Sequence, residues 1–146
     1  MKETYILSGQ RTAMGSLMGG LSSVPAPRLG ATAISAAINK AQVKKEDVQA
    51  AFMGQVIQAG VGQAPARQAA LFAELPQGTP CVTVNKVCGS GLQTIINGHQ
   101  SIVMGDADLV VSGGMENMSL APHILPKSRW GYKFGSQEIK DAMQWD

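Results

Sequence analysis

The stretch VNKVCGSGLQTI, residues 84–95, joins the end of a strand pattern to the start of a helix pattern. Residues 80–87 read PCVTVNKV, and their β-branched Val and Thr side chains predict a strand. Residues 89–104 carry apolar side chains at helical spacing, and Gly105 follows in the position that commonly ends a helix. A strand that leads through a tight turn into a helix is a repeating unit of α/β folds.

The same alternation extends along the chain on both sides of this stretch. The patterns predict strands over residues 4–8, 50–57 and 109–112 and helices over residues 28–41 and 67–75. The resulting order, βαβαβαβ, predicts an α/β fold with a layered sheet whose ligand sites lie at the carboxyl ends of its strands. Residues 137–145 again show helical spacing.

Composition narrows the class of protein. The 146 residues are 45% hydrophobic and 15% charged, which is typical of a globular domain. The net charge of +2 is too small to indicate a nucleic-acid partner. No apolar run approaches the ~20 residues of a membrane span, and the amino terminus lacks a signal-peptide core. We therefore expect a cytoplasmic protein that binds neither membrane nor nucleic acid.

The two cysteines differ in their surroundings. Cys81 and Cys88 are seven residues apart along a predicted strand, roughly 23 Å at about 3.3 Å per residue, so they are expected to be free thiols. Cys81 lies inside the strand and reads as a core residue. Cys88 precedes a helix amino terminus, which stabilises a thiolate, and its N–H could contact an acyl oxygen. The alternative is that Cys88 is a small buried apolar residue, and local physics leaves both readings open.

Three motifs together resemble the thiolase family of acetyl-CoA acetyltransferases. They are VNKVCGSGLQTI, the segment SGGMENMSLAPH at residues 112–123 and the opening ILSGQRTAMGSLMGGL at residues 6–21. The resemblance covers the whole chain without evident gaps. It implies a thiolase-like fold with an incomplete amino-terminal core domain over residues 1–118. Residues 119–146 would then be the start of a loop domain.

The resemblance implies a Claisen condensation and its reversal. Cys88 would be the nucleophile that forms an acyl-cysteine, and its backbone N–H an oxyanion donor. The substrates would be coenzyme A thioesters, acetyl-CoA or a 3-ketoacyl-CoA, with no tightly bound cofactor and no metal ion. The cofactor-binding residues stay unknown. Thiolases of fatty acid metabolism are homo-oligomers, so the resemblance also implies a homodimer or homotetramer.

The chain lacks two motifs that the resemblance calls for. Thiolases carry an activating histidine in a Gly-His-Pro setting and a second cysteine in Cys-Gly-Gly-Gly, and neither occurs here. His99 would lie about 16 Å from Cys88 along a helix, and His123 is read as a loop residue. We therefore expect this chain alone to be inactive, with the missing half supplied by a longer protein or a second chain. A non-catalytic fragment or assembly module is the alternative.

Two further groups of residues have open roles. Glu116 and Asn117 follow a predicted strand and could either line the site or support the Cys88 loop by hydrogen bonds. Basic and aromatic side chains cluster at Lys127, residues 129–130 and residues 132–134. The resemblance assigns this cluster to oligomer contacts and a positive rim near the phosphates of the coenzyme. In thiolases the helix after the cysteine is buried between two core domains.

Overall fold

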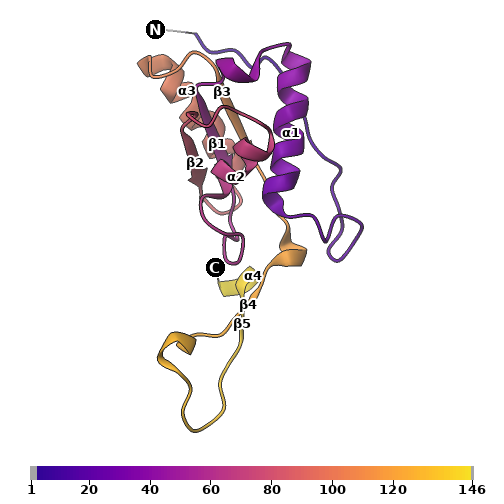
Figure 1. The fold of residues 1–146 in the computed structure, drawn as a ribbon, viewed down its shortest axis with the longest axis vertical. Helices are drawn as coiled ribbons and strands as arrows, with labels where there is room; N and C mark the ends of the chain where they lie inside the picture. The colour runs from indigo at the N-terminus through magenta and orange to yellow at the C-terminus, as the bar shows by residue number, and fades with distance from the viewer. Residues whose placement is uncertain (1–2, 146) are drawn as a thin grey trace.

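A three-stranded parallel sheet forms the centre of the structure, a computed structural model that describes residues 3–145 (Figure 1). The strands lie in the order β2-β1-β3 and comprise β1 (Ala50–Gly54), β2 (Cys81–Val84) and β3 (Val110–Gly114). Both pairings of β1 are parallel. Parallel strands covered by helices confirm the predicted α/β class.

The register of the sheet brings the ends of the three strands to one level. Gly54, the last residue of β1, pairs with Val84 of β2 and with Gly114 of β3. The segments that follow all three strands therefore begin side by side. We call this side of the sheet the carboxyl edge.

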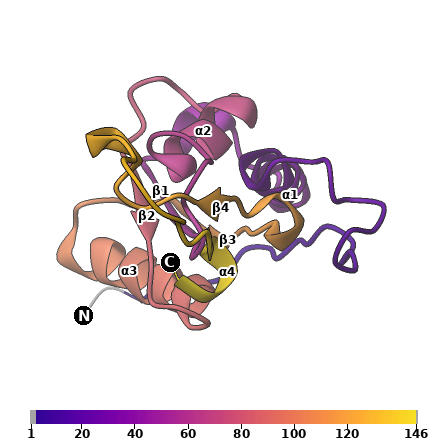
Figure 2. The same ribbon diagram turned by 90° about the horizontal axis from the view of Figure 1, so that it is seen from below.

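Helices cover both faces of the sheet (Figure 2). Helices α1 (Ala26–Ala41) and α2 (Pro65–Phe72) pack together over one face, and α3 (Ser90–Met104) packs against β1 and β3 on the other. The short 3-10 helix η1 (Lys45–Asp47) leads into β1. The core between α1, α2 and the sheet is made of small and medium apolar side chains, among them Ala31, Ile34, Ile38, Ala51, Met53, Ala66, Ala69 and Met115.

The helix boundaries follow familiar signals. Prolines stand at the first or second helical position of α1 and α2, where a missing N–H costs no hydrogen bond. Because of these prolines both helices begin two residues before the predicted starts at 28 and 67. Helix α3 ends as predicted, with Gly105 in the left-handed conformation at φ 85°. Within residues 3–145, no helix is both long enough and apolar enough to cross a membrane.

The predicted first strand, residues 4–8, does not form, so the described order begins with a helix instead of βαβαβαβ. The segment runs beside the sheet without entering it, and Tyr5, Ile6 and Leu7 are exposed. Side chains tie it down instead: Ser8 Oγ donates to the Ala37 carbonyl at 2.6 Å. A strand needs a hydrogen-bonding partner as well as a strand-forming sequence, and no local pattern can supply that partner.

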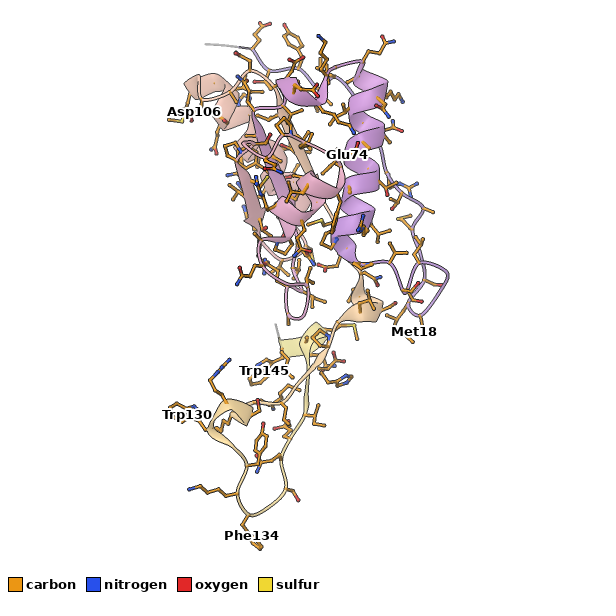
Figure 3. The ribbon with its side chains drawn as sticks, in the orientation of Figure 1. Met18, Glu74, Asp106, Trp130, Phe134 and Trp145 are labelled. Atoms are coloured by element: carbon orange, nitrogen blue, oxygen red, sulfur yellow. The ribbon has the colours of Figure 1, made fainter. Side chains whose placement is uncertain are left out.

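The last residues form an arm that projects away from the sheet (Figures 1 and 3). It contains η2 (Met118–Leu120), the antiparallel pair β4 (His123–Ile124) and β5 (Lys140–Asp141), η3 (Ser128–Trp130) and α4 (Ala142–Trp145). The predicted helix over 137–145 was wrong except for its last turn, because cross-strand pairing takes residues 140–141. Residues 1, 2 and 146 of the predicted domain ranges lie outside the described residues.

Candidate functional site

Cys88 lies at the carboxyl edge, in the turn between β2 and α3. Strand β2 ends at Val84 and α3 begins at Ser90, so the cysteine stands two residues before the helix. It is a free, exposed thiol. The alternative that Cys88 is a small buried apolar residue does not hold for the described chain, and its position before a helix amino terminus is confirmed.

Glycines bring the start of α3 against the sheet. A β-carbon on Gly54 would fall 2.8 Å from the backbone carbon and the β-carbon of Ser90. On the neighbouring strand, a β-carbon on Gly114 would meet the Gly91 α-carbon at 3.4 Å. Helix and strand backbones can approach this closely only where side chains are absent. The position of the Cys88 turn is thus fixed by contact with β1 and β3.

Ser90 braces the turn instead of capping the helix. The helix cap is Gly89, which makes no side-chain capping hydrogen bond. The Ser90 hydroxyl donates to the Val87 carbonyl at 2.6 Å and accepts the Lys86 N–H at 2.8 Å. Ser90 is the first residue of the helix, and its hydroxyl hydrogen-bonds back into the turn.

Glu116 fastens the loop that follows β1. Its Oε2 accepts the N–H groups of Val56 at 2.8 Å and Ile57 at 3.2 Å. The carboxylate comes from the segment after β3, so it joins two neighbouring strand ends. Of the two predicted roles for Glu116, structural support is the one these contacts favour, although the loop it holds is the one after β1.

Asn117 fastens the amino-terminal loop. Its Nδ2 approaches the carbonyls of Leu21, Ser22 and Val24 at 3.1, 3.1 and 2.7 Å. Its Oδ1 accepts the Ser119 N–H at 3.0 Å. An amide side chain that both donates to and accepts from backbone groups of two segments holds those segments together. Asn117 therefore holds residues 21–24 against the carboxyl edge.

Cys81 is less exposed than Cys88. It is half-buried against the core, and its Sγ donates to the Thr79 carbonyl at 3.3 Å. Burial raises the pKa of the Cys81 thiol, and nearby Arg67 offsets only part of that rise. The structure thus confirms two free thiols and the prediction that Cys81 is a packing residue.

Neither histidine is hydrogen-bonded to the Cys88 thiol. His99 is exposed on α3, and its Nδ1 lies 3.0 Å from Thr4 Oγ1. His123 lies in β4 and not in a loop. Among residues 3–145, no side chain is hydrogen-bonded to Cys88 Sγ. The same residues contain no cluster of three His, Cys, Asp or Glu that could hold a metal ion.

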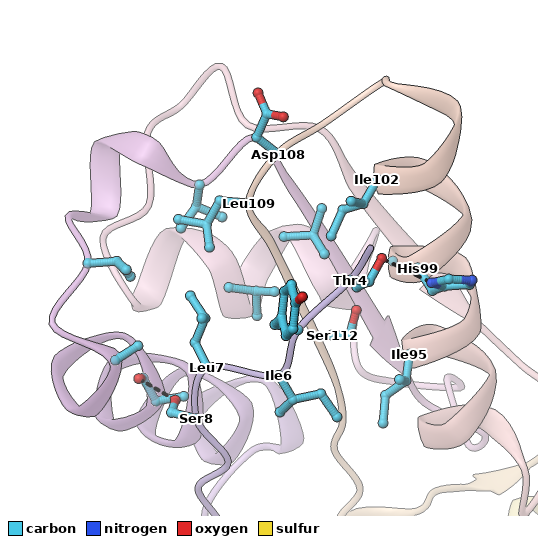
Figure 4. A pocket seen from close by; sticks show the side chains of 18 of the residues that line it. Thr4, Ile6, Leu7, Ser8, Ile95, His99, Ile102, Asp108, Leu109 and Ser112 are labelled. Atoms are coloured by element: carbon cyan, nitrogen blue, oxygen red, sulfur yellow. Dashed lines mark hydrogen bonds between the residues drawn. The ribbon is translucent and has the colours of Figure 1, made fainter. Parts of the chain in front are cut away.

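Two hollows lie near this part of the fold, and Cys88 lines neither. An apolar hollow of about 430 Å³ separates the amino-terminal segment from β3, with Leu7, Ile95 and Leu109 on its walls (Figure 4). A second, of about 410 Å³, lies between residues 12–17 and residues 116–119. The cysteine is exposed, and the turn and helix around it carry further exposed apolar side chains, Val87, Leu92, Ile95 and Ile96.

Asn85 is a residue of the turn whose role the sequence did not predict, although it lies within residues 84–95. Its Oδ1 accepts the Val87 N–H at 3.0 Å, and its Nδ2 donates to the Val56 carbonyl at 3.2 Å. Val87 adopts a left-handed backbone conformation with φ 48°. The available signal was an asparagine two residues before a tight turn, where its side chain commonly bonds the backbone N–H.

Comparison with known proteins supports one family throughout. Residues 4–146 match the family model described as the amino-terminal domain of thiolase. An acetyl-CoA acetyltransferase from Chromobacterium violaceum is 53% identical over 141 residues, which are 97% of this chain and 36% of that protein. One from Cupriavidus necator is 51% identical over 143 residues, covering 98% of this chain and 36% of that protein.

Similar proteins also occur in Homo sapiens and Gibberella zeae. The mitochondrial acetyl-CoA acetyltransferase of Homo sapiens is 47% identical over 143 residues, which are 98% of this chain and 33% of that protein. A cytosolic acetyl-CoA acetyltransferase from Gibberella zeae is 52% identical over 139 residues. The chain therefore spans about a third of the length of the curated relatives that it matches.

Proposed function

This chain belongs to the thiolase family, and from that premise we propose that it supplies the acyl-accepting cysteine, Cys88, of an acetyl-CoA acetyltransferase. The observation that carries the proposal is the place of the thiol. It is exposed at the carboxyl edge of a parallel sheet and stands two residues before a helix amino terminus. Such a position leaves the sulfur accessible to a thioester, at the edge of the sheet where α/β folds bind their ligands.

The proposed reaction proceeds in two acyl transfers. In the first, the Cys88 thiolate attacks the carbonyl carbon of acetyl-CoA, the carbon–sulfur bond to coenzyme A breaks, and coenzyme A leaves as a thiolate that takes up a proton. In the second, the enolate carbon of another acetyl-CoA attacks the acyl group, and Cys88 leaves as the thiolate. Acetoacetyl-CoA is the product, and the reverse sequence is thiolytic cleavage of a 3-ketoacyl-CoA.

Both steps pass through a tetrahedral intermediate with negative charge on oxygen. The Cys88 N–H, next to the positive end of the α3 dipole, is the proposed donor to that oxygen. No side chain among residues 3–145 hydrogen-bonds to Cys88 Sγ, and the proposal takes the acid/base for the thiol and the enolate from outside these residues. By resemblance to thiolases, this group is a histidine of the carboxyl-terminal half.

We also propose the division of the chain into a core domain over residues 1–118 and the start of a loop domain over 119–146. The projecting arm that carries β4 and β5 supports this boundary. Its Trp130 and Phe134 side chains are almost fully exposed, as contacts with another subunit of a homodimer or homotetramer require. A cytoplasmic role in fatty acid metabolism completes the proposal, with coenzyme A thioesters as substrates and no tightly bound cofactor.

A second candidate is a non-catalytic assembly module. The observation in its favour is the same absence of a base hydrogen-bonded to Cys88 within residues 3–145. Under this reading the exposed apolar side chains of α3 pack against a partner chain, and Cys88 performs no chemistry. The two candidates differ in whether a second polypeptide accompanies the chain and whether the thiol becomes acylated.

Acyl trapping tests the proposal. The protein is purified at its natural length, incubated with acetyl-CoA and digested, and the acetyl group is located by mass spectrometry. We expect it on the peptide that contains Cys88. Thiolysis of acetoacetyl-CoA by coenzyme A should fall more than about 10³-fold in Cys88→Ala, while Cys81→Ala serves as the matched control. Undiminished thiolysis in Cys88→Ala would overturn the proposal.

A further inference from the structure

Val87, the residue before the proposed nucleophile, has a backbone conformation that is unfavourable for a β-branched residue. Its φ of 48° lies in the left-handed region, which β-branched residues rarely adopt. The side chain is 64% exposed, so packing against the rest of the chain does not impose this conformation. Strained conformations persist only where surrounding interactions determine them, and here those interactions are hydrogen bonds.

Asn85 holds one side of the Val87 turn. Its Oδ1 accepts the Val87 N–H at 3.0 Å, while its Nδ2 donates to the Val56 carbonyl at 3.2 Å. The amide therefore links the turn to the loop that follows β1. That loop is held in its own place by the Glu116 carboxylate, which accepts the N–H groups of Val56 and Ile57.

Ser90 holds the other side. Its hydroxyl donates to the Val87 carbonyl at 2.6 Å and accepts the Lys86 N–H at 2.8 Å. The Ser90 N–H also donates to the Val87 carbonyl, at 3.0 Å. The side chain is only 4% exposed and lies against Gly54 of β1, so its position is set by the sheet.

We propose that Asn85 and Ser90 are positioning residues that hold Val87 in its left-handed conformation and thereby fix the direction of the Cys88 Sγ and N–H. The N–H of Val87 is held by Asn85 and its carbonyl by Ser90, so both peptide groups around this residue are fixed. The next residue along the chain is Cys88. This inference rests on the proposed function of Cys88, and neither side chain is proposed to touch the substrate.

The first experiment compares Asn85→Ala and Ser90→Ala in the protein at its natural length. A nucleophile displaced by a fraction of an ångström loses rate without losing substrate affinity, so kcat for thiolysis should fall about 10- to 100-fold while KM stays within about twofold. Asn39, which is exposed on helix α1, provides the matched control, and Asn39→Ala should stay within twofold. Asn85→Ala and Ser90→Ala rates that equal the Asn39→Ala rate would overturn the proposal.

A second experiment separates positioning from general loss of structure. Glycine adopts positive φ readily, so Val87→Gly removes the need for the two hydrogen bonds. In a double-mutant cycle, the loss caused by Asn85→Ala should shrink to about threefold or less in the Val87→Gly background. An equal loss in both backgrounds would show that Asn85 acts by another route, and the proposal would fail.

Alkylation of the Cys88 thiol tests the positioning role of Asn85 and Ser90 independently of the proposed function. The rate at which iodoacetamide labels Cys88 depends on the setting of the thiol and requires no turnover. We expect Asn85→Ala to slow labelling at least about threefold, and Asn85→Ser, whose hydroxyl can accept the Val87 N–H, to restore it. If Cys88→Ala retains thiolysis, the proposed function fails while the labelling rates still decide the positioning role. Unchanged labelling in Asn85→Ala and Ser90→Ala would overturn the inference.

Discussion

Gly54 of β1 and Ser90 of α3 lie so close that a β-carbon on Gly54 would be 2.8 Å from the Ser90 β-carbon. Real β-carbons do not approach backbone and side-chain carbons at that distance. The start of the helix next to Cys88 is therefore placed by the absence of one side chain in the central strand.

Gly54→Ala should separate α3 from β1 at the carboxyl edge. Overpacking of this kind costs about 1–3 kcal/mol, so the free energy of unfolding measured in urea should fall by that amount. Gly78→Ala is the matched control, because nothing lies within 4 Å of its added β-carbon. Its free energy of unfolding should change by less than about 0.5 kcal/mol. Equal stabilities of the two variants would contradict the close approach.

Glu116→Ala should loosen the loop after β1. The carboxylate accepts the N–H groups of Val56 and Ile57, and a hydrogen bond to a charged acceptor contributes about 1.5–3 kcal/mol. Hydrogen exchange at these two amides should therefore accelerate at least about tenfold, as measured by NMR or mass spectrometry. Glu46→Ala, an exposed carboxylate on η1, should leave their exchange unchanged. Unaltered exchange in Glu116→Ala would show that other contacts hold the loop.

Lys45 lowers the pKa of the Glu74 carboxyl below its ordinary value of 4.5, chiefly through a hydrogen bond of 2.7 Å. A depressed carboxyl pKa stabilises the fold above the ordinary value, and the contribution disappears as pH falls through the lowered pKa. Because Glu74 is exposed, salt should weaken the effect. In Lys45→Met, the NMR titration of Glu74 should move upward toward 4.5. A titration that does not move would mean that the ion pair is absent in solution.

Sequence pattern alone located the parts of the fold that local interactions determine. The three parallel strands and α3 agree with their predicted places because β-branched runs, helical spacing and Gly105 are local signals. The strand predicted at residues 4–8 and the helix predicted at 137–145 failed for one common reason. Each depends on what lies beside it: the first lacks a pairing partner, while residues 140–141 acquire one in β4.

The candidate site divides in the same way. Cys88 could be singled out because a cysteine between a strand and a helix is visible in the sequence. The bonds from Asn85 to Val56 and from Glu116 to the loop after β1 could not, because they join backbone groups that only the folded chain brings near. Glu116 and Val56 are 60 residues apart, yet their hydrogen bond is 2.8 Å long.

Thiol labelling should distinguish Cys88 from Cys81 in the unmodified protein. Cys88 is exposed, whereas Cys81 is half-buried, donates to the Thr79 carbonyl and has its pKa raised by burial. At neutral pH, iodoacetamide should therefore modify Cys88 at least about tenfold faster, as followed by peptide mass spectrometry. In urea the two rates should converge, because unfolding removes the burial that protects Cys81. Similar rates in the folded protein would mean that the core around Cys81 opens freely, and convergence only in urea would attribute the difference to the fold.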